Sequence, residues 1–141
     1  MGEGMGKLNL EERIALTRTI VELLDSWQVS AADQITLLAL PEGTRPGAIR
    51  QFRQGTPFPE DERVMERIEH LTGIADALRT SYPHNAHMGA IWMHKANHRF
   101  ENRMPLAAMI EDGLGAIIAV RTHLDCSYDW HISGSANPPP K

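Results

Sequence analysis

Histidine pairs are the residues of this chain whose type and spacing could support chemistry. The sequence has seven histidines, and two pairs, His84-x-x-His87 and His94-x-x-x-His98, have spacings that suit zinc ligands. A structural zinc site needs four ligands, each held in place by further hydrogen bonds, and the sequence pattern does not supply them. We therefore interpret these histidines as scattered, pH-sensitive surface residues, and we expect no metal site.

A nucleophilic site is no better supported. Cys126, Asp129 and His131 lie within six residues of one another near the C-terminal tail, with no rigid turn or oxyanion donors beside them. Gly113-Leu114-Gly115 lacks the preceding strand and the third glycine of a phosphate-binding loop. These patterns favour a protein that uses no cofactor and is not an enzyme.

A short basic segment indicates one binding surface. Between Gly43 and Pro59 the sequence has three arginines, Arg45, Arg50 and Arg53, and no acidic residue. The net charge of the whole chain is −4, which disfavours general nucleic-acid binding. Salt nevertheless screens charges over about 8 Å at physiological ionic strength, so a local basic surface can still contact phosphates.

The bulk composition is that of a small globular protein. The 141 residues are 42% hydrophobic and 23% charged, and a single cysteine rules out an internal disulfide. No apolar run approaches the roughly 18 residues of a membrane span, and the glycine-rich first residues do not resemble a secretory signal. We expect a cytoplasmic protein that does not bind membranes.

Helical periodicity dominates, and no segment alternates as a strand would, so the predicted class is all-α. Asn9 and Ser30 are expected N-caps, and Pro59 and Pro105 are expected first residues of helices. One apolar stripe is expected on the first helix and another on the fourth: Leu16, Ile20, Leu23 and Trp27, then Val64, Ile68, Leu71, Ala75 and Leu78. The expected helices cover 10–27, 31–40, 45–54, 59–82, 90–96, 105–112 and 114–124.

Two of these helices read as a helix-turn-helix. The pair is 31–40 and 45–54, with the small Ala39 and the permissive Gly43 at the turn. Ile49 and Phe52 can face the core, which leaves the polar side chains of the second helix for the major groove. An ordinary surface helix with solvated arginines is the alternative. The predicted DNA-binding residues are Thr44, Arg45, Arg50, Gln51, Arg53 and Gln54.

An ordered set of motifs over residues 27–125 resembles the Xre/MbcA/ParS antitoxins. Trp27-Gln-Val-Ser30 is similar to the family's Trp-Gly-Leu-Ser. Further similar positions are Arg67-Ile68, Leu71, Gly73-Ile74, Ala77-Leu78, Pro83, Trp92-Met93, Asn97, Phe100, Pro105-Leu106, Gly113, Val120-Arg121 and Leu124-Asp125. The chain departs from the family at Ala96-Asn97, where Pro-Asn is usual, and at Glu101-Asn102, where Gly-Gly is usual.

The resemblance implies an antitoxin of a type II toxin–antitoxin system. Such a protein binds and occludes a RES-domain toxin that consumes NAD, and represses its own operon as a homodimer on operator DNA. The implied organisation is a helix-turn-helix region over 1–58, a toxin-binding region over 59–130 and a flexible tail over 131–141. The implied toxin-binding residues are Trp92, Asn97, Phe100, Arg121 and Asp125.

Alternatives remain open at this point. Trp92 and Phe100 could fill the core against the stripe of the fourth helix instead of contacting a partner. A stand-alone helix-turn-helix regulator without a toxin is the second hypothesis, and a small metal-dependent enzyme built on the histidines is the third.

Overall fold

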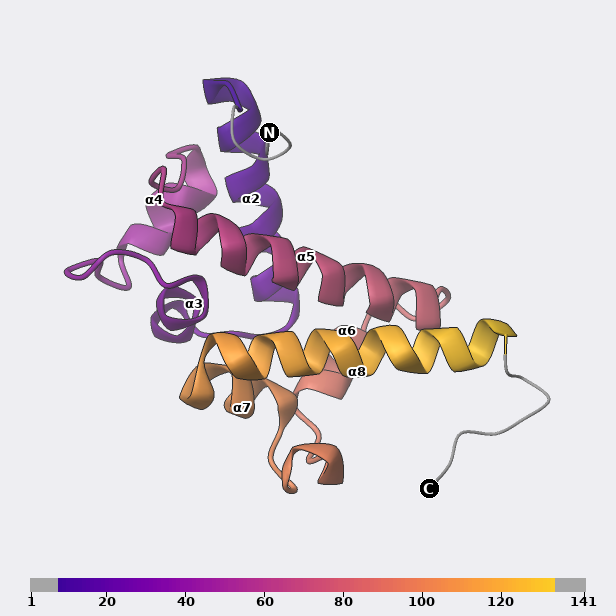
Figure 1. The fold of residues 1–141 in the computed structure, drawn as a ribbon. Coiled ribbons are helices and arrows are strands. Elements are labelled where there is room, and N and C mark those ends of the chain that lie inside the picture. Colours follow the sequence, from indigo (N-terminus) through magenta and orange to yellow (C-terminus); the bar gives the residue numbers. More distant parts are fainter. Residues whose placement is uncertain (1–7, 134–141) are drawn as a thin grey trace. The chain divides into compact units, whose positions relative to one another are not determined.

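The chain is all-helical over the part that the structure describes. A computed structural model describes residues 8–133, with side chains for residues 8–126. The helices (Figure 1) are α2 (Leu10–Ser26), α3 (Ala31–Leu38), α4 (Ala48–Gln54), α5 (Glu62–Ser81), α6 (Met88–Met93), the 3₁₀ helix η1 (His98–Phe100), α7 (Pro105–Asp112) and α8 (Leu114–Ser133). Over these residues the β structure is limited to an isolated bridge between Asn97 and Arg103, which confirms the predicted class. No helix in this range has the length and apolarity to cross a bilayer.

Two compact units make up the chain, Met1–Glu69 and His70–Lys141, with the boundary inside α5. We call them unit 1 and unit 2 and describe each separately. The predicted division after residue 58 stays a prediction. Of the flexible tail predicted over 131–141, residues 134–141 lie outside the described residues. Residues 131–133 were wrongly assigned to it, because they belong to α8, which extends to Ser133, beyond the predicted end at Leu124.

In unit 1, α2 begins as the sequence predicts, and Ile20 and Trp27 of its expected stripe are buried. Asn9 accepts a hydrogen bond from the Glu12 amide (2.8 Å), and Glu12 accepts one from the Asn9 amide (2.9 Å), which confirms the N-cap. The buried residues are Thr17, Ile20, Val21 and Leu24, followed by Trp27 at the helix end. Leu16 and Leu23, expected in the stripe, are only half-buried.

Both helices of the proposed helix-turn-helix are shorter than predicted. Ser30 caps α3 as expected, accepting from the Asp33 amide at 3.2 Å. The helix ends at Leu38 because Ala39 adopts a left-handed conformation (φ 54°). The next helix was expected from Arg45 and instead begins at Ala48, after a turn at Pro46 and Gly47. Its C-terminus is correct, with Gly55 at φ 125°.

The segment before α5 is extended, so the prediction that Pro59 begins the helix is wrong. The helix starts at Glu62, and the Asp61 carboxylate accepts a hydrogen bond from the Arg63 amide at 2.8 Å. Phe58 is held from both sides by α2. Its amide donates to the Thr17 hydroxyl (2.9 Å), and its carbonyl accepts from the Arg13 guanidinium (2.9 Å). These bonds keep the backbone extended where proline alone would permit a helix.

Unit 2 contains the second half of α5 and the elements α6 to α8. Pro105 begins α7 and Gly113 (φ 81°) separates it from α8, as predicted. The short helix expected at 90–96 lies at Met88–Met93. Helix α5 buries Val64, Ile68, Leu71 and Leu78 of its expected stripe, whereas Ala75 is only half-buried. Ile74 and Ala77, which were not expected in the stripe, are also buried. The other large buried side chains of unit 2 are Met93, Leu106, Met109, Ile117, Val120 and Leu124.

Candidate functional site

Helix α4 separates an apolar face from a polar one. Ile49 and Phe52 are buried, and the Phe52 ring meets Phe58 edge-on with centroids 4.9 Å apart. The helix packs mainly against α2. Because these two buried side chains are three residues apart, they lie on one face of the helix, which leaves its other face to solvent. The exposed side chains are those predicted for DNA contact on the helix, namely Arg50, Gln51, Arg53 and Gln54.

An ion pair to α2 holds Arg53. Its guanidinium binds the Asp25 carboxylate in a fork, with Nε to Oδ2 and Nη2 to Oδ1 both at 3.0 Å. The hydrogen bond to Asp25 raises the pKa of Arg53, against a smaller opposing effect of burial. The two side chains remain 47% and 37% exposed, so Arg53 is still accessible. Part of its charge is nevertheless neutralised, and Asp25 fixes its position over α4.

Asp25 also connects α2 to α3. Its Oδ1 accepts a hydrogen bond from the Nε2 of Gln34 at 2.8 Å. Gln34 is fully buried, and its Nε2 also donates to the Val29 carbonyl at 3.1 Å. One carboxylate therefore orients both helices of the proposed helix-turn-helix. Sequence reasoning missed this residue because nothing local marks Asp25 as a partner for positions nine and twenty-eight residues away.

The remaining predicted DNA-binding residues lie in the connection over 39–47. The Thr44 hydroxyl donates to the Pro41 carbonyl at 2.6 Å and is half-buried, so it serves the turn itself. Arg45 is exposed. Gly43 adopts a positive φ of 90°, as the sequence predicted. The whole connection is longer than the usual helix-turn-helix turn of about three or four residues.

Arg18 is a further cation near α4 that the sequence did not single out. Its Nη2 donates to the Gln54 carbonyl at 3.4 Å, at the C-terminal end of α4 where a positive charge is favourable. It lies two helical turns before Asp25 on the same face of α2. Arg18 and Asp25 therefore both hold the last turn of α4, through Gln54 and Arg53.

Three rings gather in unit 2, and we call them the ring cluster: Trp92 of α6, Phe100 of η1 and His123 of α8. Trp92 meets Phe100 edge-on with centroids 6.3 Å apart and stacks on His123 at 6.3 Å, while Phe100 meets His123 edge-on at 5.7 Å. All three are half-buried. Burial lowers the pKa of His123, and the nearby Arg99 charge adds to that effect. His123 was not among the predicted site residues.

Hydrogen bonds shape the loop that carries Phe100. The Asn97 side chain accepts from the Arg99 amide at 3.0 Å, and its backbone pairs with Arg103. Glu101 and Asn102 both adopt left-handed conformations, with φ 61° and 64°. Arg103 anchors the loop to α7 through Asp112 (2.7 Å) and Glu111 (3.0 Å). Asn97 is thus a structural residue of the loop as well as a predicted contact.

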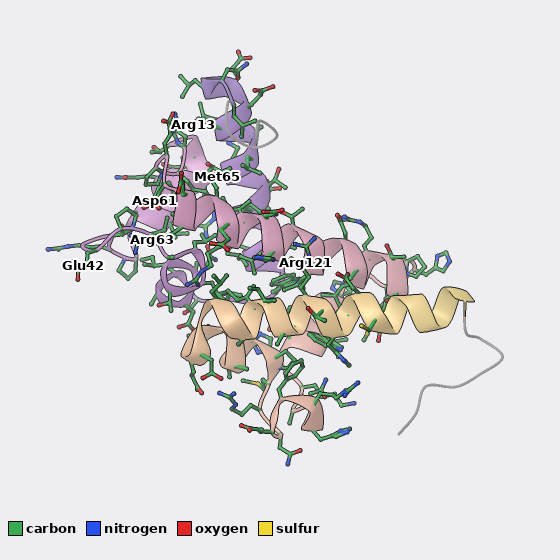
Figure 2. The ribbon with its side chains drawn as sticks, viewed as in Figure 1. Arg13, Glu42, Asp61, Arg63, Met65 and Arg121 are labelled. Atoms are coloured by element: carbon green, nitrogen blue, oxygen red, sulfur yellow. The ribbon has the colours of Figure 1, made fainter. Side chains whose placement is uncertain are left out.

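The side chain of Arg121 packs against α5 at Gly73. Its Nη1 lies 3.1 Å from Nδ1 of His70, and a Cβ placed on Gly73 would overlap its guanidinium. Figure 2 shows Arg121 between the ribbons of α5 and α8. Asp125, one turn further along α8, is exposed, with its Oδ2 3.9 Å from the Arg121 Nε. Of these two predicted toxin contacts, Arg121 therefore packs inside unit 2 and Asp125 faces solvent.

The described residues form no assembled site of the kind that a metal-dependent enzyme or a nucleophilic enzyme would need. Over the part of the chain with described side chains, no three His, Cys, Asp or Glu residues converge as metal ligands. His84, His87, His94 and His98 are all exposed, and so is Cys126. The side chains of Asp129 and His131 lie outside the described set.

Comparison with known proteins gives one informative relationship. No family model matches the sequence. The chain is 30% identical over 103 residues to the "Uncharacterized protein y4oB" of Sinorhizobium fredii (strain NBRC 101917 / NGR234). The alignment covers 73% of this chain and 76% of that protein.

Proposed function

We propose that this chain, which belongs to the same family as y4oB of Sinorhizobium fredii, is the antitoxin of a toxin–antitoxin pair. In this proposal unit 1 is an Xre-like region that binds operator DNA through α4. Unit 2 binds and occludes a RES-type toxin through the ring cluster and its neighbours. The protein acts in the cytoplasm as a homodimer and catalyses no reaction itself.

The DNA-binding half of the proposal rests on the polar face of α4. Arg50, Gln51 and Gln54 are exposed on a helix whose other face is buried against α2. Arginine and glutamine offer the donors and acceptors that read guanine and adenine edges, and both also bind phosphate. Arg45, exposed in the preceding connection, extends the same basic segment. The contact of Asp25 with Arg53 makes Arg45 and Arg50 the principal cations for DNA.

The long connection over 39–47 changes how such a surface would dock. In a helix-turn-helix with a short turn, the first helix crosses the DNA backbone. Here the longer connection separates the two helices. We therefore propose that Arg45 in this connection contacts a phosphate and that α4 supplies the contacts to base edges.

The toxin-binding half rests on the ring cluster. Half-buried aromatic side chains are frequent anchors in protein interfaces, because they bury a large area at little cost in side-chain entropy. Ile91, next to Trp92 in the chain, is 50% exposed and adds apolar surface. The cluster is held by three separate elements, so its shape is formed before a partner binds.

Two pairs of motif positions have a physical reason in this structure, which supports the resemblance. Glycine is usual in that family where this chain has Glu101 and Asn102, and both residues here adopt the left-handed conformation that glycine favours. Gly73 and Arg121 are two other positions of the motif set, and a Cβ on residue 73 would force the Arg121 guanidinium to move. Arg121 is accordingly a positioning residue, and Asp125 is the exposed contact on α8.

Co-purification with the product of the adjacent gene tests the proposal. We expect the two proteins to form a stable complex and this chain to restore growth when the neighbour is expressed. The variant Asp125→Lys, which changes an exposed side chain, should weaken the complex without unfolding the chain. Trp92→Ala should weaken it more, while Tyr82→Ala, an exposed ring outside the cluster, should not. DNA binding without a toxic neighbour would instead support a stand-alone regulator.

A further inference from the structure

Unit 1 contains a groove that neither proposed binding surface uses. It lies between α2 and the first half of α5 and has a volume of about 450 Å³, within the usual range for ligand pockets. Its floor is apolar, formed by Leu16, Phe58, Met65 and Ile68. Phe58 and Ile68 are buried, whereas Leu16 and Met65 are half-buried and supply the accessible apolar surface. Figure 2 labels three of the residues that line it: Arg13 of α2, Asp61 just before α5, and Met65 of α5.

Carboxylates form the rim of this groove. Glu60 and Asp61 already have partners, since Glu60 pairs with Arg13 at 3.1 Å and Asp61 with Arg63 at 3.7 Å. Glu62, Glu66 and Glu69 follow at spacings of four and three residues, which places them in one row along α5. Each of the three is exposed, and none forms an ion pair with another described residue. Like charges at this spacing repel one another, and a bound cation relieves that repulsion.

We infer that this groove is a docking site for a basic amphipathic helix of a partner protein. The acidic row repels anionic ligands, so DNA and anionic lipid are excluded from this face. Along a helix the row has spacings of about 6 and 4.5 Å, which Lys or Arg residues one turn apart on a facing helix can match. Apolar residues beside those cations would then enter the floor between Leu16 and Met65.

Charge complementarity decides between a partner and a second copy of this chain. The acidic row attracts a basic partner, whereas a second copy of a chain with a net charge of −4 has no overall charge that would draw it to this groove, so the proposed homodimer forms through another surface. The site belongs to unit 1 and involves neither the exposed face of α4 nor the ring cluster. It can therefore be present or absent independently of the antitoxin proposal.

A synthetic peptide of about 18 residues, patterned with Leu and Lys as an amphipathic helix, tests the inference on the full chain. We expect its methyl NMR perturbations to centre on Met65 and Ile68, and its affinity to fall with rising salt. The same peptide with Glu in place of Lys should not bind. The triple variant Glu62→Gln, Glu66→Gln, Glu69→Gln should weaken binding about tenfold, and Met65→Ala should weaken it as well.

A matched control removes the same charge elsewhere. The triple variant Glu22→Gln, Glu42→Gln, Glu101→Gln alters three exposed carboxylates outside the groove and should change binding less than about twofold. Gln and Glu have similar helix propensities, so the groove variant should fold normally. Equal binding by both triple variants, or perturbations centred on the ring cluster, would overturn the inference. A dimer of the chain that only the groove variant abolishes would overturn it in favour of a second copy.

Discussion

The replacement Arg50→Ala gives the most direct measure of DNA binding by α4. Arg50 is exposed beside the buried Ile49, and no carboxylate among the described residues forms an ion pair with it, in contrast to Arg53. Loss of one phosphate contact lowers the salt slope of log affinity by about 0.9. A fourfold rise in salt should therefore weaken the wild type roughly 3.5-fold more than it weakens the variant.

Arg53 should behave differently because of Asp25. Its guanidinium already binds that carboxylate through two hydrogen bonds of 3.0 Å, so Arg53→Ala removes less free positive charge than Arg50→Ala does. We expect a smaller fall in the salt slope. Asp25→Asn should have the opposite sign, since it frees Arg53 and removes a negative charge from the DNA-facing side.

Fluorescence anisotropy on the DNA upstream of the gene, between about 50 and 200 mM salt, measures these slopes. Arg79→Ala, which removes an exposed arginine of unit 2, is the control for net charge. The order expected for the loss of slope is Arg50→Ala, then Arg53→Ala, then Arg79→Ala. Identical slopes for Arg50→Ala and Arg79→Ala would refute the assignment of α4 as the DNA-binding helix.

Two further predictions concern unit 2. In an Arg121→Ala background, Gly73→Ala should stabilise the chain by about 1 kcal/mol, because alanine favours the helix. In the wild type it should stabilise the chain clearly less, because the new Cβ displaces Arg121 from His70. Urea unfolding measures both free energies, and equal effects in the two backgrounds would contradict the contact. Because burial lowers the pKa of His123 below 6.5, the unfolded chain takes up a proton that the folded chain does not, so the free energy of unfolding should fall as pH drops below about 6.5. His123→Phe keeps a ring in the cluster and removes this titration, so thermal unfolding of the variant should depend less on pH; an unchanged pH dependence would mean that His123 titrates alike in both states.

Helix boundaries could be predicted where a local signal fixes them. Asn9 and Ser30 satisfy amides three residues ahead, so the caps are encoded within a few positions. Pro105 and Gly113 act in the same local way at the ends of α7. The all-α class followed from periodicity for the same reason, since each helix carries its own apolar spacing.

Boundaries set by distant contacts could not be predicted. Pro59 has a strong local preference for a first helical turn, yet Thr17 and Arg13 hold Phe58 extended from 41 and 45 residues away. Thr17 also explains the shifted stripe of α2, because its hydroxyl is needed inside unit 1 for the Phe58 amide. A polar residue in a buried position is invisible to a pattern based on hydrophobicity.

The residues of the candidate sites could likewise be predicted where a local pattern marks them and not where distant contacts do. The exposed positions of α4 could be read from the spacing of Ile49 and Phe52, because a helix places neighbours on predictable faces. The partners that orient those residues, Asp25 and Arg18, could not, since their pairing depends on how α2 meets α4. His123 was likewise missed, because a lone histidine on a helix gives no sign that two rings surround it.

The contacts that position the two proposed surfaces have no residue in common. Asp25 and Arg18 hold α4 within unit 1, whereas Asn97 and Arg103 hold the loop of Phe100 within unit 2. Substitutions without shared partners are expected to act additively, so DNA binding and toxin binding should be separable by mutation. If toxin binding nevertheless changes DNA affinity, α5 is the element to examine, because it runs from Glu62 to Ser81 and belongs to both units.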